Sequence, residues 1–172
     1  MVALEADDEE APVNSPANSV TAGPPPVAAG PYRRILVAWD GSADSVAALR
    51  AATAIAGGGP GHVVALSVHA AALHREASND EATETSAQAN RMQATFEATR
   101  AAIARNPAVR IDLHTANGRD VAGSVCDYAA EHGFDLLVVG RHGEGGLMHP
   151  KLGHIAESAA RSCKIPVLLV SA

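Results

Sequence analysis

The sequence has few aromatic residues and no long apolar run. Only 3% of its 172 residues are aromatic although 47% are hydrophobic, so a core must be built mainly from aliphatic side chains. No apolar stretch approaches the ~18 residues that a membrane-spanning helix needs, and we expect no membrane span. The two cysteines, Cys126 and Cys163, lack the close cysteine neighbours of a zinc or CxxC redox site. We therefore predict two buried, free thiols in a reducing cytoplasm.

The chain also lacks an excess of basic residues. Its net charge is −6, and five acidic residues fall within the first ten positions. The remaining acidic residues number 14 (19 minus 5) against 13 basic ones, so the rest of the chain is nearly neutral. A nucleic-acid-binding surface needs a concentration of Lys and Arg. We expect no nucleic-acid partner.

The first 31 residues differ in composition from the remainder. They begin MVALEADDEE and continue with a Pro- and Ala-rich stretch ending PPPVAAGP. A secretory signal would start with positive charge and contain an apolar block, and this segment has neither. Such a composition is typical of a disordered segment. We predict a disordered acidic, Pro/Ala-rich tail over residues 1–31, one folded domain over 32–172, and a cytoplasmic location.

Apolar segments alternate with segments of helical spacing over the whole predicted domain. Strands are expected at 33–39, 62–68, 109–115, 135–140 and 166–170, and helices from the N-cap Ser42, over 84–105, over 121–133 and over 154–163, with a loop at 69–82. The alternation predicts an α/β fold: an open five-stranded, Rossmann-like parallel sheet flanked by helices, with right-handed crossovers. Ligands bind such sheets beyond the carboxyl ends of the strands, where strand order reverses.

Glycine-bearing turns follow the first and fourth predicted strands, as WDGS and as GRHGEGGLMHPKLGH. In the second segment, Gly140, Gly143 and Gly153 lie between a strand and a helix. Glycine admits a close backbone approach, and a helix start offers unpaired N–H groups to an anion. The segment is neither a Walker A loop nor a GxGxxG fingerprint. Turn and cap glycines are the simpler alternative, but three in this arrangement favour a phosphate-binding segment.

The spacing G-x2-G-x9-G, between a strand and the last helix, resembles the nucleotide motif of the universal stress protein family. The opening ILVAWDGSADS and the closing CKIPVLLV resemble the two ends of that domain as well. The resemblance implies the adenine-nucleotide alpha-hydrolase-like variant of the fold and a stress-response regulatory domain that binds ATP or another adenine nucleotide, with or without Mg²⁺. It also implies a homodimer formed through the C-terminal strand and an unknown regulatory protein partner, without catalytic residues or a resident metal.

Carried over position by position, the resemblance implies a nucleotide site. Asp40 and the backbone at Ala38 would meet the base and ribose, and the main chain of Val68 would hold the adenine edge. The segment after the fourth strand and the next helix start would hold the ribose and phosphates through Val139, Gly140, His142, Gly143, Gly153, His154 and Ile155.

The chain departs from the motif after its third glycine. ATP-binding members carry hydroxyl side chains there, whereas this chain has His154, Ile155 and Ala156. Each lost neutral hydrogen bond is worth about 1 kcal/mol, so ATP affinity is expected to be weakened. Protonated His154, Arg141 or Lys151 could supply compensating charge.

Two other functions fit parts of the sequence. DGSADS, residues 40–45, faintly resembles the SGGxDS loop of ATP pyrophosphatases, which would make the chain a nucleotide-hydrolysing enzyme. The fold could also serve as a nucleotide-free dimeric interaction module. His142, His149 and His154 suggest a metal cluster only weakly, because no paired carboxylate accompanies them. We expect a binding protein and not an enzyme.

Overall fold

The computed structural model describes residues 31–70, 79–143 and 151–172. Nine elements are formed in these ranges: β1 (Arg34–Ala38), α1 (Ala43–Ala56), β2 (Gly61–Ala70), α2 (Asn79–Ile103), β3 (Val109–Gly118), α3 (Val121–Glu131), β4 (Leu136–Gly140), α4 (His154–Ser162) and β5 (Val167–Val170). The predicted tail, apart from its last residue, lies outside the described residues. The same is true of most of the predicted loop, although β2 and α2 both extend into its range.

The five strands form one parallel sheet in the order β3-β2-β1-β4-β5. The chain passes from β1 outward to β3, and then returns to place β4 on the other side of β1. Strand order therefore reverses between β1 and β4, which places the two glycine-bearing turns at neighbouring strand ends. This is the predicted α/β architecture, with β3 and β5 at the two edges.

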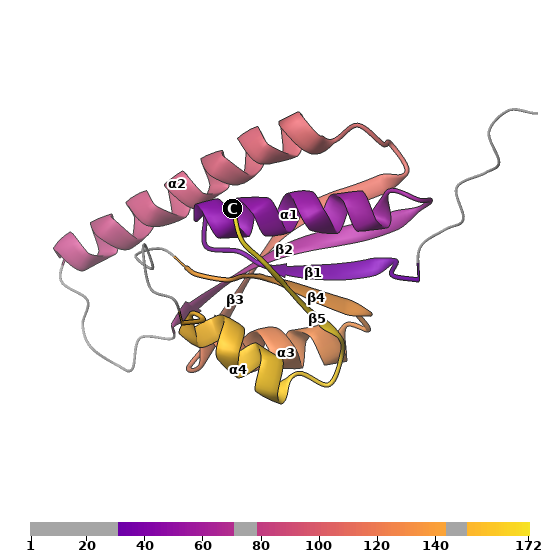
Figure 1. Cartoon of the computed structure of the whole chain (residues 1–172). Helices are drawn as coiled ribbons and strands as arrows, with labels where there is room; N and C mark the ends of the chain where they lie inside the picture. The colour runs from indigo at the N-terminus through magenta and orange to yellow at the C-terminus, as the bar shows by residue number, and fades with distance from the viewer. Residues whose placement is uncertain (1–30, 71–78, 144–150) are drawn as a thin grey trace, which may run out of the picture.

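Helices cover both faces of the sheet (Figure 1). Helices α1 and α2 lie on one side, and α3 and α4 lie on the other. The first face is packed around side chains such as Ile35, Val37 and Phe96. The opposite face buries a second cluster that includes Leu36 and Leu137. Consecutive residues of β1 thus serve different cores, which explains why its sequence is apolar throughout.

Local signals in the sequence set the helix starts. Ser42 caps α1 by accepting a hydrogen bond from the N–H of Ser45 at 3.2 Å, as predicted. The turn before it contains Gly41 with φ = 81°, in the left-handed region that glycine tolerates. Asp120 caps α3 in the same way as Ser42 caps α1.

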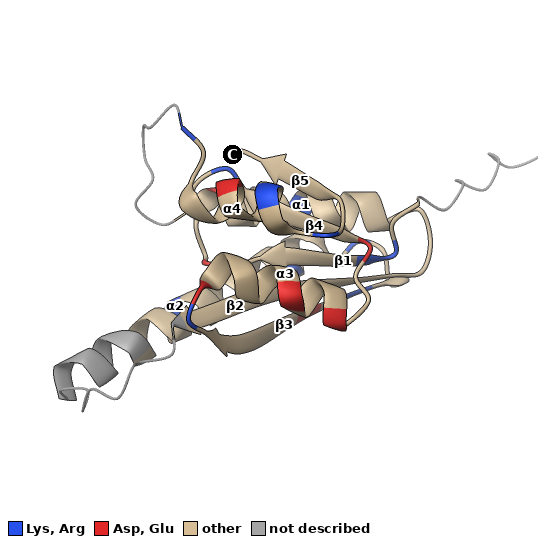
Figure 2. Ribbon diagram, turned by 90° about the horizontal axis from the view of Figure 1, so that it is seen from below, with Lys and Arg blue, Asp and Glu red and all other residues tan. Residues whose placement is uncertain are grey.

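On α4, Glu157 and Arg161 form an ion pair at 2.6 Å, and both charge signs occur on this side of the molecule (Figure 2).

None of the described helices is long and apolar enough to cross a membrane.

The two cysteines do not remain free thiols. Cys126 on α3 and Cys163, which ends α4, form a disulfide with their Cα atoms 5.1 Å apart. The sequence prediction was wrong because it weighed only sequence spacing, and these residues are 37 positions apart. They meet because α3 and α4 pack side by side on the same face of the sheet (Figure 1).

Reducing the disulfide is expected to lower the free energy of unfolding by about 2–4 kcal/mol, because an open chain gains conformational freedom when it unfolds. Urea denaturation with and without dithiothreitol measures the change. The double variant Cys126→Ser, Cys163→Ser should resemble the reduced protein and should not respond to dithiothreitol. Two reactive thiols in the native protein under oxidising conditions would contradict the pairing.

Candidate functional site

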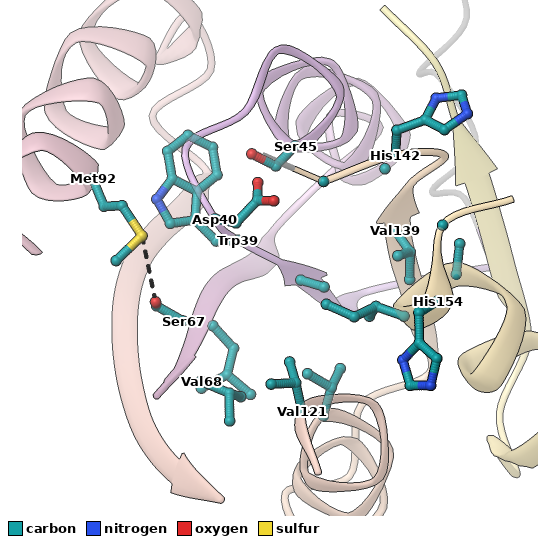
Figure 3. A pocket seen from close by; sticks show the side chains of 18 of the residues that line it. Trp39, Asp40, Ser45, Ser67, Val68, Met92, Val121, Val139, His142 and His154 are labelled. Atoms are coloured by element: carbon teal, nitrogen blue, oxygen red, sulfur yellow. Dashed lines mark hydrogen bonds between the residues drawn. The ribbon is translucent and has the colours of Figure 1, made fainter. Parts of the chain in front are cut away.

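A cavity of about 460 Å³ lies at the carboxyl ends of β1, β2 and β4, where strand order reverses. All four helices and the segments that follow β1 and β4 also contribute to its described wall (Figure 3). The wall includes all ten residues named from the sequence: Ala38, Asp40, Val68, Val139, Gly140, His142, Gly143, Gly153, His154 and Ile155. Segments that are distant in the sequence therefore meet in one place.

The cavity exists next to β2 because β1 ends before β2 does. The last paired rung joins Ala38 to Leu66, and the N–H of Trp39 donates to the carbonyl of Leu66 at 2.9 Å. Backbone groups alternate sides along a strand, so Val68, two residues beyond Leu66, directs its N–H and C=O toward the position that β1 has vacated. A main-chain donor and acceptor thus face the cavity side by side.

Asp40 follows β1 at the entrance to α1. Its Oδ1 accepts a hydrogen bond from the N–H of Ser42 at 3.0 Å. Its other oxygen lies beside Gly143, only 2.9 Å from where a Cβ on that glycine would stand. Asp40 therefore both orders the turn into α1 and lines the cavity.

Each of the three motif glycines is explained by a different feature of its surroundings. At Gly140 a Cβ would lie 2.9 Å from the Cβ of Asp44 and 3.0 Å from its carbonyl carbon, so glycine lets β4 approach the start of α1. At Gly153 a Cβ would lie 3.1 Å from the carbonyl oxygen of Arg141. Gly143 does not have a positive φ. It is exposed, and a side chain there would extend toward Asp40 at the cavity wall.

The start of α4 forms the wall opposite β2. Gly153 is the N-cap residue and supplies no side-chain hydrogen bond to the first N–H groups of α4, which include those of His154 and Ile155. The N–H of Gly153 itself donates to the carbonyl of Arg141 at 2.9 Å, which fixes the position of the helix start. Uncapped N–H groups and the helix dipole make this end attractive to an anion.

His142 contributes to the cavity differently from what the sequence suggested. Its ring turns away from the cavity (Figure 3), with Nδ1 3.3 Å from Oδ2 of Asp44 and Nε2 3.1 Å from the carbonyl oxygen of Lys151. The N–H of His142 also donates to Asp44, at 2.9 Å. Its ring and its N–H are therefore engaged in holding the loop, and His142 acts here as a positioning residue.

Asp44 is the acceptor that joins three parts of the chain. It lies in the first turn of α1, and it accepts hydrogen bonds from the N–H of Ala172 at 2.9 Å and from His142. The hydrogen bond from Ala172 lowers the pKa of the Asp44 carboxyl most strongly; burial opposes this, and the bonds and charge of His142 add to the lowering. The charged carboxylate is thus favoured in the folded protein.

A lowered pKa in the folded state means that ionised Asp44 stabilises the fold above its ordinary pKa of 3.8. That contribution is lost as pH falls through the folded-state pKa. Asp44→Asn should therefore reduce the free energy of unfolding by about 1–3 kcal/mol near pH 7. The difference from wild type should narrow as the pH is lowered from about 5 to 3. Urea denaturation of both proteins at several pH values measures this difference in the free energy of unfolding. A difference that stays constant with pH would contradict the stabilising role of ionised Asp44.

The sequence reasoning missed several residues of the cavity wall. Ser45, Ser67 and Met92 line it, and Trp39 does so with an indole that is only 3% exposed. Trp39 could have been suspected, because it is the single tryptophan and directly precedes Asp40. The others follow only from the packing of α1 and α2 on the sheet.

Of the three residues proposed to replace the missing hydroxyls with charge, His154 lines the cavity. Neither Arg141 nor Lys151 belongs to the cavity wall as far as the structure describes it. His149, one member of the weak histidine cluster, lies outside the described residues. Among those that are described, no group of three or more His, Cys, Asp or Glu side chains is arranged to hold a metal ion.

Comparison with known proteins places this geometry in a family. The sequence profile of the universal stress protein family matches residues 31–171. A search of curated proteins found no match. Among solved structures, universal stress protein UspA from Lactobacillus plantarum has a TM-score of 0.70 at 22% identity, over 81% of this chain and 97% of that one.

Two other similar structures contain nucleotides. A universal stress protein in complex with cAMP has a TM-score of 0.62 at 23% identity, over 81% of this chain and 97% of that one. The universal stress protein from Archaeoglobus fulgidus in complex with dAMP has a TM-score of 0.55 at 15% identity, with the same two coverages. These similarities establish the shared fold.

Proposed function

The chain belongs to the universal stress protein family, and we propose that it binds an adenine nucleotide in the cavity at the carboxyl ends of β1, β2 and β4. The observation that carries the proposal is the main chain of Val68, whose N–H and C=O face this cavity beyond the end of β1. An adenine presents a ring nitrogen acceptor beside an amino donor, which is the complementary pair.

The opposite wall suits the rest of a nucleotide. The uncapped start of α4 can receive a phosphate group, and Gly143 leaves room beside Asp40 for a ligand to approach the backbone. The Asp40 carboxylate accepts hydrogen bonds only, so it is suited to ribose hydroxyls and would repel a phosphate. The nucleotide would therefore lie with its base over β2, its ribose near Asp40 and its phosphate at α4.

The phosphate end favours a short nucleotide over ATP. His154, Ile155 and Ala156 supply no hydroxyl, and neither Arg141 nor Lys151 lines the described wall. Two similar structures are complexes with the monophosphates cAMP and dAMP. We propose AMP or a cyclic monophosphate as the preferred class and weaker binding of ATP, with or without Mg²⁺.

We propose that the protein is a regulatory binder and not an enzyme. Incubation with ATP followed by chromatography distinguishes these functions, because release of AMP and pyrophosphate would support the pyrophosphatase-like alternative. The regulatory protein partner and the cytoplasmic location remain predictions of the sequence.

Gly143→Val tests the proposed site. Among the described residues, a Cβ at this position meets only the Asp40 carboxylate within 4 Å, so the fold should be retained, while the larger side chain should obstruct the ligand. We expect AMP binding, measured by calorimetry, to weaken at least about tenfold, corresponding to ~1.4 kcal/mol.

The matched control is Ala160→Val, which adds similar bulk on an exposed position of α4 that does not line the cavity. It should bind AMP as wild type does. Equal affinities of wild type and Gly143→Val, with equal melting temperatures, would remove this cavity as the nucleotide site.

We further propose that two copies pair through β5. This strand is an edge of the sheet, and its Leu169 is one of two large hydrophobic side chains described as exposed. The carbonyls of Pro166 and Val170 accept bonds from β4, so by alternation Val167 and Leu169 direct their backbone groups outward. An apolar strand with free outward groups is a template for pairing with a second copy.

Leu169→Pro should convert the dimer to a monomer at micromolar concentration. Proline removes the outward N–H and is tolerated at an edge, so the bonds between β4 and β5 should remain. Light scattering measures the mass. Leu169→Ala, which keeps the N–H, is the control and should retain more of the dimer. A monomeric wild type at the same concentration would contradict the proposal.

A further inference from the structure

One part of the cavity wall is not explained by the positions of base, ribose and phosphate described above. Trp39, Ser67 and Met92 form a corner where the cavity extends between the end of β1 and α2 (Figure 3). We call these three residues the α2 corner. They lie on the sheet face covered by α1 and α2, whereas Val68 and Val125 belong to the opposite face.

The indole N–H of Trp39 is a buried donor without an acceptor. The residue is 3% exposed, and Nε1 is the only buried side-chain nitrogen or oxygen found without a hydrogen-bond partner in the described part of the chain. Burying an unmatched N–H costs free energy, so such groups occur mostly where a ligand or water completes them. Figure 3 shows the nitrogen on the side of the indole that faces Met92 and Ser67.

Ser67 supplies a second underused donor at the same place. The residue is 6% exposed, and its hydroxyl donates to the sulfur of Met92 over the long distance of 3.8 Å. Thioether sulfur is a weak acceptor, so a better acceptor would displace this contact. The Trp39 ring is held in place by a T-shaped contact with Phe96, with the ring centroids 5.9 Å apart. The α2 corner suits an uncharged group with a hydrogen-bond acceptor.

We propose that the α2 corner is a base-recognition site, in which the indole N–H of Trp39 donates to a ring nitrogen of a purine. This rests on the proposed function, because Val68 would hold one edge of the same base from β2. A purine carries acceptor nitrogens on more than one edge, so the two contacts are compatible. Trp39 would thus be a specificity-determining residue, since a base with carbon at the recognised position leaves the indole N–H unmatched.

The wild-type protein provides the first test, because Trp39 is its only tryptophan and its emission reports on the corner directly. Titration with AMP should change the emission maximum or intensity in parallel with calorimetric binding. Analogues of AMP in which carbon replaces one ring nitrogen should then be compared. One analogue should bind about three- to tenfold more weakly than AMP, as expected for one lost hydrogen bond.

Trp39→Phe provides the second test, because it keeps an aromatic ring but removes the donor. It should bind AMP about three- to tenfold more weakly than wild type does, and it should no longer distinguish AMP from that analogue. Val121→Ala, which alters the wall on α3 without removing a donor, is the control. It should preserve the distinction whatever its effect on affinity.

These experiments distinguish a failure of the proposed nucleotide binding from a failure of the proposed role of Trp39. If wild type binds none of AMP, ADP or ATP, the proposed function is overturned and base recognition with it. If AMP binds but leaves tryptophan emission unchanged, only the role of Trp39 is overturned. Because the emission titration of wild type needs no substitution, this result can be obtained even if Trp39→Phe does not fold.

Discussion

The difference in length between two neighbouring strands determines where the cavity forms. β1 and β2 pair up to Ala38 and Leu66, and β2 then continues through Ser67–Ala70 without β1 beside it. The backbone groups of Val68 lose a strand partner there while β3 still supports the other side of β2. A strand held firmly on one side and open on the other is a preorganised hydrogen-bonding edge.

The loop after β4 must be held against this edge for the cavity to have a second wall. Asp44 does so by accepting hydrogen bonds from His142 and from Ala172, and Gly140 makes this possible by letting β4 approach the helix that carries Asp44. The start of α1, the glycine segment and the end of β5 are thereby connected through one carboxylate. The shape of the site consequently depends on residues that do not line it.

The sequence predicted the fold because each element carries its own signal. Uninterrupted apolar segments indicated buried parallel strands, and the turns WDGS and GRHG indicated which strand ends would meet. The resemblance then placed ten residues that the structure brings to one cavity. These features depend on local patterns, which a sequence displays directly.

Features that depend on the packing of distant segments were not predicted. The disulfide requires α3 and α4 to be adjacent, and the ring of His142 turns away from the cavity because Asp44 and Lys151 bind it. The unmatched N–H of Trp39 can be recognised only when every possible acceptor has a position. In each case the deciding partner is far away in the sequence, and no local pattern points to it.

The disulfide gives the cavity two walls of unequal compliance. Helices α3 and α4 both line it, and they are joined covalently through Cys126 and Cys163. On the opposite side, α2 contributes Met92 and is held to the sheet by non-covalent contacts. The disulfide ties the end of α4 to α3, so these two walls are expected to move together, whereas α2 can shift against the sheet independently of them. If a nucleotide binds as proposed, its phosphate would meet the covalently joined walls and its base would lie nearer the wall that α2 forms.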